Sequence, residues 1–267
     1  SLQIIFMGTP EFSINTFNSI IKSGHKVLRV YTQPPKKKLR GQKILKSPIH
    51  LIANKHNIDV KTPNNLDNES DYTFFSNTKI DLVVVVAYGK IIPEKYFRIP
   101  NLMFLNLHAS LLPKWRGAAP IQRSILSHDS ETGISIMKLI SKLDEGPVMK
   151  QTKLQIQNNI SAGELSNKLS IIGAKALVES LDLISQGKAI FKEQDNLKSS
   201  YAKKINKSES KINWSDEAKN ILAKINAFNP KPGAWFTFGN ERIKVFKAIE
   251  INSKGKPGEV LDKELTV

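Results

Sequence analysis

The stretch at residues 81–87 (DLVVVVA) restricts the fold of this chain more than any other feature. Its consecutive valines leave no polar position between them, so a strand here must be buried on both faces. Such strands are typical of a parallel sheet that helices cover on both sides. Helix-like stretches alternate with further strand-like runs, which lie at residues 3–7, 25–32, 102–108 and 133–139. The sequence therefore predicts an α/β fold with a right-handed, mostly parallel sheet.

A long helix is expected over residues 162–186, at the end of the first unit. Ser161 and Glu164 have the spacing of a capping box, and Gly187 stands where the helix would stop. The polar and basic residues 188–206 show little periodicity. They predict a linker or a connecting strand between residues 1–187 and a second unit over residues 207–267.

The second unit is expected to contain one helix followed by a small β-barrel. Ser215 is expected to cap a helix that ends before Asn229 and carries Asp216 and Glu217 in its first turn. Short apolar runs separated by Gly, Pro and Asn then predict the barrel. Because 61 residues are few for a closed barrel of about five strands, we expect the barrel to be incomplete.

The formal charge of +16 over 267 residues predicts a polyanionic partner such as a nucleic acid, an anionic lipid or a phosphorylated substrate. The absence of cysteine excludes disulfides, thiolate nucleophiles and cysteine-based zinc sites, and it fits a cytosolic protein. No apolar run is long enough to span a membrane, and the first residues lack the pattern of a signal peptide. We therefore expect a cytoplasmic protein without a membrane partner.

Asn106 and His108 form the candidate catalytic pair. Because these residues are two apart on a strand, their side chains should project from the same face. They lie next to the strand's C-terminal end, where open α/β sheets bind ligands. An amide and an imidazole can polarise a carbonyl and shuttle a proton, whereas an isolated histidine is more often structural. Asp144 follows the strand at 133–139 and either orients His108 or is an ordinary loop acid. The histidine spacings suggest no metal site.

Three further motifs each allow two interpretations. Residues 8–10 (GTP) form a tight turn or a ligand contact, and since no glycine fingerprint follows, a nicotinamide cofactor is not expected. Residues 34–43 carry Lys or Arg at five of ten positions, as a solvated face or as a functional loop. Residues 115–123 (WRGAAPIQR) form either a phosphate-binding or stacking surface or a tightly packed loop entering a helix.

Taken together, these segments resemble the methionyl-tRNA formyltransferases. The similar segments are MGTPEF (7–12), YTQP (31–34), RGQK (40–43), VVVAYGKIIP (84–93), NLHASLLPKWRGAAPIQRSI (106–125), TGISIMKL (132–139), LDEGPVM (143–149), INWS (212–215), AFNPKPGAWF (227–236) and KPGEVLD (256–262). The resemblance spans essentially the whole chain. It implies a Rossmann-like formyltransferase catalytic domain, a basic linker and a small OB-like β-barrel domain that binds tRNA.

The resemblance also implies the reaction and the residues that carry it. A formyl group is transferred from 10-formyltetrahydrofolate to the α-amino group of methionine on initiator methionyl-tRNA, by a bacterial monomer and without a metal. The catalytic residues implied by position are Asn106, His108 and Asp144. The implied folate contacts are Ser110, Leu111, Leu112 and Pro113, with Ala87, Tyr88, Gly89 and residues 137–142 lining the pterin pocket.

The implied tRNA contacts lie in the basic segment and are Lys36, Lys37, Lys38, Arg40 and Lys43. The family usually has an acidic residue and a proline–glycine mixture here, whereas this chain has PKKKL at 35–39. Phosphate attraction should therefore persist or increase. Lysines 203, 204 and 207 and the barrel would hold the rest of the acceptor stem.

Two other functions are compatible with parts of the sequence. A formyltransferase acting on glycinamide ribonucleotide or on a nucleotide-linked amino sugar would share the Asn106, His108 and Asp144 chemistry, but it would not need the basic segment or the second unit. A non-catalytic RNA-binding protein would explain the charge, but it would not explain why those three residues occur together with SLLP at 110–113.

Overall fold

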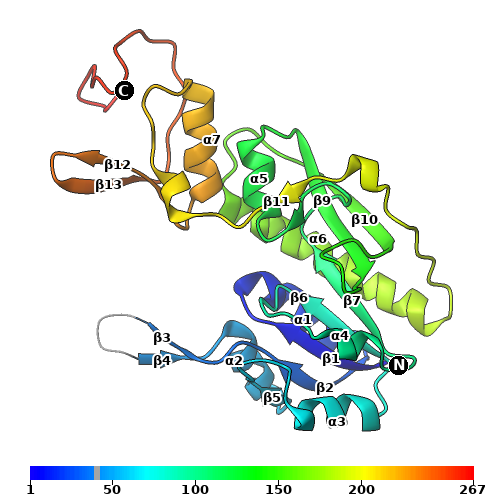
Figure 1. The fold of residues 1–267 in the computed structure, drawn as a ribbon. Coiled ribbons are helices and arrows are strands. Elements are labelled where there is room, and N and C mark those ends of the chain that lie inside the picture. The colour runs from blue at the N-terminus through cyan, green and yellow to red at the C-terminus, as the bar shows by residue number, and fades with distance from the viewer. Residues whose placement is uncertain (39–42) are drawn as a thin grey trace.

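The computed structural model describes residues 1–38 and 43–267, and its centre is a seven-stranded sheet (Figure 1). The strand order is β10-β9-β7-β6-β1-β2-β5. Five neighbouring strands run parallel, namely β5 (Asp59–Lys61), β2 (Lys26–Tyr31), β1 (Gln3–Gly8), β6 (Leu82–Val86) and β7 (Met103–His108). At one edge, β9 (Glu131–Lys138) runs antiparallel to β7, and β10 (Val148–Gln155) runs antiparallel to β9. The mostly parallel α/β sheet predicted from the sequence is confirmed.

Strand β6 lies inside the sheet, between β1 and β7, and all five of its residues are buried. Its side chains alternate between two hydrophobic clusters, with Val84 on one face and Val83 and Val85 on the other. Fully burying a side chain of this size contributes about 1.5–3 kcal/mol. The valine run therefore forms a central strand with apolar packing on both sides, as its composition predicts.

Helices cover both faces of the sheet and connect its strands. In chain order they are η1 (Glu11–Ser13), α1 (Ile14–Lys22), α2 (Pro48–Lys55), α3 (Glu69–Asn77), α4 (Glu94–Phe97), α5 (Pro120–Leu126) and α6 (Ala162–Ser185). The capping box of Ser161 and Glu164 begins α6, and Gly187 follows its end with a φ of 68°. Both features were predicted. Gly173 of α6 lies so close to Leu107 of β7 that an added Cβ would come within 2.7 Å of the Leu107 side chain, so this helix packs directly beneath the candidate site.

Residues 188–206 are packed against the first unit rather than forming a free linker. They contain η2 (Asn196–Lys198) and β11 (Tyr201–Ala202), which pairs in parallel with β8 (Arg116–Gly117). Lys192 also forms a bridge with Val148 at the start of β10. The prediction of a connecting strand is therefore closer to the structure than the prediction of a linker.

The second unit begins with η3 (Lys207–Ser210) and α7 (Ala218–Phe228), and one prediction for it is wrong. Glu217, not Ser215, is the N-cap of α7, so Asp216 and Glu217 precede the first turn. Asn213 explains the later start, because its side chain bonds the Ser215 N–H and the Asp216 carboxylate and holds a turn before the helix. The helix ends at Phe228, before Asn229, as predicted.

The described residues contain no closed barrel after α7. Strands β12 (Ala234–Phe238) and β13 (Glu241–Val245) form a two-stranded hairpin, and residues 246–267 add no strand to it. The run GEVLD at 258–262, which the barrel prediction relied on, is exposed at every position and forms no strand. A barrel therefore stays a prediction for this unit.

A second hairpin replaces the long loop that the basic segment suggested. Strands β3 (Lys36–Lys38) and β4 (Lys43–Leu45) pair in antiparallel register on either side of residues 39–42. In Figure 1 this hairpin and the β12–β13 hairpin both extend to the left, away from the seven-stranded sheet. Within the described ranges, no helix has the length and apolar character needed to cross a membrane.

Candidate active site

Three polar side chains are buried together near the C-terminal end of β7. Asn106 and His108 lie on this strand and Asp144 lies in the loop after β9, and each is less than a tenth exposed. The Asp144 Oδ2 atom lies 3.6 Å from His108 Nδ1. Asn106 and His108 share one face of β7, because residues two apart on a strand point the same way. The predicted candidate residues are thus neighbours, although they are far apart in the sequence.

The ring of His108 is oriented by the main chain of Trp115. Its Nε2 atom lies 2.8 Å from the Trp115 carbonyl oxygen, so Nε2–H donates to that oxygen. The Nδ1 atom faces Asp144 at a distance longer than a hydrogen bond. One ring nitrogen is therefore anchored, and the other remains free for a reacting group.

The carboxylate of Asp144 is held by the main chain of Gly117. The Gly117 N–H donates to Asp144 Oδ2 at 2.7 Å. Asp144 has a φ of 51°, in the left-handed region, and the nearby Gly146 is so close to Lys138 that an added Cβ would lie 1.8 Å from its carbonyl oxygen. This glycine is required by the close approach of the loop to β9, and it fixes the path that brings Asp144 to His108.

The predicted folate-contact loop after β7 is held by hydrogen bonds within the loop and to Ser135. The Ser110 hydroxyl donates to the Lys114 carbonyl at 2.5 Å, and the Ser135 hydroxyl donates to the Ser110 carbonyl at 2.7 Å. Ser135 also accepts from the Leu112 N–H. Since Ser110 is fully buried, its hydroxyl orders the loop; Leu112 is also buried, and Leu111 and Pro113 are partly accessible.

Of the predicted folate contacts at residues 87–89, two are exposed and one has a buried side chain. Ala87 and Gly89 are exposed and have φ values of 49° and 74°. The Tyr88 side chain is buried, and burial raises the pKa of its phenol, with a smaller contribution from Asp71. The Tyr88 carbonyl accepts from Thr9 and Gln33. A ligand here would therefore meet the main chain and Ala87 rather than the phenol.

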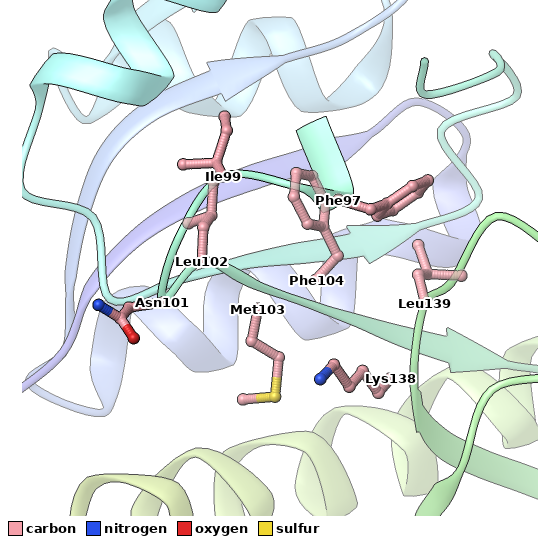
Figure 2. A pocket seen from close by; sticks show the side chains of 8 residues that line it. All are labelled: Phe97, Ile99, Asn101, Leu102, Met103, Phe104, Lys138 and Leu139. Carbon is pink, nitrogen blue, oxygen red and sulfur yellow. The ribbon is translucent and has the colours of Figure 1, made fainter. Parts of the chain in front are cut away.

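A cavity of about 300 Å³ lies beside residues 138 and 139, inside the stretch predicted to line the pterin pocket (Figure 2). Its other lining residues are Phe97, Ile99, Asn101, Leu102, Met103 and Phe104. Figure 2 shows Phe97, Phe104 and Leu139 gathered at one end, so this part of the cavity is apolar and aromatic. Neither residues 87–89 nor residues 110–113 line it.

A second cavity of about 300 Å³ borders the predicted folate-contact loop at Leu112 and Pro113. Its remaining walls are residues 148–151 of β10 and residues 192–195 of the segment after α6. Each cavity is thus lined by only two of the predicted folate residues, and residues 87–89, 110 and 111 line neither of them.

Lys36 of β3 lies close enough to Lys90 for their positive charges to interact. Lys36 is exposed, and its ammonium group donates to the Gln33 side chain. Lys90 donates to the carbonyl groups of Pro63 and Asn64. Burial, and to a smaller extent the charge of Lys36, lowers the pKa of Lys90. Arg40 lies outside the described residues, as do the side chains of Lys37, Lys38 and Lys43.

The arginines of residues 115–123 are structural, which decides between the two interpretations of that motif. Arg116 is 1% exposed and donates to Gln194 and Asn196. Arg123 pairs with Glu209 at 2.7 Å. The Trp115 indole N–H donates to Asp129. The segment is therefore a tightly packed loop that enters α5, and its two guanidinium groups are already paired.

Sequence reasoning missed the groups that hold the catalytic candidates in place. The Trp115 carbonyl and the Gly117 N–H are main-chain atoms, so no side-chain pattern could reveal them. Gln194, which donates to the carbonyl groups of Asp144 and Gly146, lies in a stretch without periodicity. Among the described residues, no group of three or more His, Cys, Asp or Glu side chains is placed to hold a metal ion.

Two family models match the chain, one described as formyl transferase over residues 2–181 and one as formyl transferase, C-terminal domain, over residues 204–266. The methionyl-tRNA formyltransferase of Pelagibacter ubique is 48% identical over 266 residues, which is 99% of this chain and 86% of the relative. That of Parvibaculum lavamentivorans is 42% identical, over 98% of this chain and 86% of the relative.

Solved structures show the same fold at low sequence identity. The N-formyltransferase of Helicobacter canadensis, in complex with folinic acid and dTDP-3-aminofucose, has a TM-score of 0.74 and 22% identity over 95% of this chain and 89% of its own. HypX of Aquifex aeolicus, in complex with tetrahydrofolic acid, has a TM-score of 0.72 and 17% identity over 97% of this chain and 40% of its own. At these identities the likeness concerns the fold alone.

Proposed function

The chain belongs to the methionyl-tRNA formyltransferase family, and we infer that it transfers the formyl group of 10-formyltetrahydrofolate to the α-amino group of methionine on initiator methionyl-tRNA, for translation initiation. The observation that carries this inference is the similarity over nearly the whole chain. The grouping of Asn106, His108 and Asp144 supports it, because formyl transfer to an amine needs hydrogen-bond donors and a proton acceptor at one place.

The reaction is an acyl transfer between two nitrogens. The neutral α-amine attacks the formyl carbon, a C–N bond forms and the carbonyl electrons move to the formyl oxygen. When the carbonyl re-forms, the bond to N10 of the folate breaks, N10 takes up a proton and the amine loses one. Formylmethionyl-tRNA and tetrahydrofolate are the products, and no covalent bond to the protein is required.

Asn106 and His108 are proposed to stabilise the negative charge that develops on the formyl oxygen. The available donors are the Asn106 amide and, in the protonated imidazolium, the Nδ1–H of His108, because Nε2–H already donates to the Trp115 carbonyl. The loss of one such donor typically costs about 10²–10³ in rate. Asp144, fixed by the Gly117 N–H, stands beside Nδ1 to orient the imidazole and to accept the proton of the incoming ammonium.

The folate is proposed to lie along the C-terminal ends of β6 and β7. Ala87 and the main chain of residues 88–89 would form one side, and Leu111, Leu112 and Pro113, ordered by Ser110, the other. Residues 137–142, which continue from the end of β9 beside β7, would complete the pterin pocket.

The basic hairpin and the second unit are proposed to bind the tRNA. Lys36, Lys37, Lys38, Arg40 and Lys43 would hold the end of the acceptor stem, and the exposed lysines 203, 204 and 207 would hold phosphates further along it. That both hairpins extend to the same side in Figure 1 supports this division. We accordingly propose a catalytic domain over residues 1–187, a basic linker over 188–206 that packs against this domain, and an OB-like tRNA-binding domain over 207–267. We further propose that the protein acts as a monomer in a bacterial cytoplasm.

The experiment that tests this function compares acceptors. Purified protein with 10-formyltetrahydrofolate is expected to formylate charged initiator methionyl-tRNA and to leave glycinamide ribonucleotide and amino-sugar nucleotides unmodified. Turnover with either small acceptor but not with the tRNA would contradict the proposal. Tight tRNA binding by a folded protein that formylates none of them would indicate a non-catalytic RNA-binding protein.

A further inference from the structure

Gln194 uses its entire hydrogen-bonding capacity to connect two segments beside the candidate active site. Its Nε2 group donates to the Asp144 carbonyl and to the Gly146 carbonyl, both at 2.7 Å. Its Oε1 atom accepts from Arg116, at 3.1 Å from Nε and 2.8 Å from Nη2. A side-chain amide has two N–H donors and two acceptor positions, and all four are used.

The guanidinium of Arg116 determines which way this amide points. Arg116 is 1% exposed, and it also donates to Asn196 and lies 3.7 Å from Glu145. A buried guanidinium must be surrounded by acceptors, since an unpaired buried charge is costly. The amide oxygen of Gln194 is therefore fixed toward Arg116, which leaves the NH₂ group facing the Asp144 and Gly146 carbonyls.

The residues on either side of Arg116 hold the two catalytic candidates. The Trp115 carbonyl anchors His108, and the Gly117 N–H anchors the Asp144 carboxylate. Gln194 completes this arrangement, because its amide connects the Arg116 guanidinium to the main-chain carbonyl of Asp144. The carboxylate and the main-chain carbonyl of Asp144 are therefore both held by this one connected group.

The backbone of Asp144 needs such support. Its φ of 51° lies in a region that a residue other than glycine rarely occupies, and such a conformation persists only when its surroundings hold it. Trp115, whose carbonyl anchors His108, has a φ of 61° and therefore also needs its surroundings to hold its backbone conformation. Pairing of Arg116 and Ala118 with Ser200 and Ala202 holds that segment against residues 200–202, six to eight positions after Gln194.

We propose that Gln194 is a positioning residue for formyl transfer. Its amide holds Asp144 at the distance and angle from His108 that the reaction needs, and it does so from the segment that joins the two units. The proposal rests on the proposed function, since it assigns Gln194 a role at that same site. Gln194 itself does not touch the reacting atoms.

The test uses two substitutions at this position and one nearby control. Gln194→Ala removes both donors and the acceptor, whereas Gln194→Glu keeps an acceptor for Arg116 but has no N–H for the two carbonyls. Each is expected to lower kcat about 10- to 100-fold, as a displacement of about 1 Å at a catalytic group does, while KM for folate and for tRNA changes less than twofold. Leu197→Ala is the control, because this leucine lies in the same segment and is 97% exposed.

A double-mutant cycle separates positioning from general destabilisation. If Gln194 acts through Asp144, the Asp144→Asn and Asp144→Asn/Gln194→Ala proteins have the same kcat, because the group that Gln194 places is already disabled. The proposal would be overturned if the double variant's loss in kcat equalled the product of the two single-variant losses. It would also be overturned if folded Gln194→Ala had an unchanged kcat. If Gln194→Ala does not fold, Gln194→Glu decides in its place, and failure of both to fold would assign Gln194 to folding instead. Formylation by the unsubstituted protein is measured first, so that failure of the proposed function is recognised separately.

Discussion

At the scale of single residues, the candidate site depends on main-chain atoms in uncommon conformations. His108 is anchored by a carbonyl, Asp144 by an N–H, and both Trp115 and Asp144 have positive φ values. Each conformation of this kind costs of the order of 1–3 kcal/mol, so the surrounding contacts must offset it. The loop around Asp144 is consequently the most sensitive part of the site to small changes.

Gly146→Ala is expected to displace that loop. An added Cβ would lie 1.8 Å from the Lys138 carbonyl oxygen, a distance that requires the backbone to move. We expect a loss of about 1–3 kcal/mol in the free energy of unfolding, together with a fall in kcat of at least tenfold. Thermal unfolding and steady-state kinetics measure both. Gly187→Asn is the control, because Gly187 has open space around it and asparagine tolerates its φ of 68°. An active, stable Gly146→Ala protein would contradict this explanation of the loop.

The sequence revealed the side chains of the site but not the atoms that hold them. Asn106 and His108 could be paired because a strand has a period of two, and the strand itself was evident from its apolar residues. From the residues alone, Asp144 could equally orient His108 or be an ordinary loop acid, because its approach to His108 depends on the path of a loop. The family resemblance favoured the first interpretation. Contacts from Gln194 and Gly117 arise when segments distant in the sequence meet, and no local pattern encodes them.

At the scale of elements, the segment after α6 and the two hairpins differ most from expectation. Strand β10 was missed because it lies at the sheet edge and carries lysine, glutamine or threonine at five of its eight positions. Residues 188–206 resembled a linker because their order comes from pairing with β8, not from periodicity. The valine run of β6 and the capping box of α6 predicted those elements, whereas β10 and the packing of residues 188–206, which depend on tertiary contacts, were not predicted.

The ion pair of Arg123 and Glu209 links α5 to η3 and should make that junction sensitive to acid. Hydrogen bonding to Arg123 lowers the pKa of Glu209 below its ordinary value of 4.5. The folded state therefore binds fewer protons than the unfolded state, so the stabilisation is complete above pH 4.5 and is lost as the pH falls through the lowered pKa. We expect Glu209→Gln to have a lower Tm than the unsubstituted protein at pH 7, and the difference to shrink below pH 4.5. A difference in Tm that stays constant down to pH 3 would disprove the assignment.

At the scale of the whole molecule, the net charge of +16 and the two projecting hairpins fit one large polyanionic substrate. The proposed folate site lies against the sheet, and the basic hairpin extends away from it. We therefore expect the small donor and the large acceptor to bind to separate groups of residues.

Substitutions in the basic hairpin test this separation. Arg40→Ala and Lys36→Ala are expected to raise KM for tRNA without changing KM for 10-formyltetrahydrofolate. The slope of log KM against log salt should fall by about one for each phosphate that the variant no longer neutralises. Lys188→Ala, at an exposed position beyond the end of α6 and outside the basic hairpin, is the matched control for charge. Equal effects of Arg40→Ala on both substrates would refute the division.

The central claim is that formyl transfer takes place at Asn106, His108 and Asp144, and single-turnover transfer from 10-formyltetrahydrofolate to methionyl-tRNA tests it most directly. His108→Ala should reduce the rate of the chemical step by at least about 10²-fold, since it removes a donor to the developing oxyanion. His56→Ala, an exposed histidine at the end of α2, should leave that rate unchanged. A folded His108→Ala protein that transfers formyl at the rate of the unsubstituted enzyme would contradict the claim.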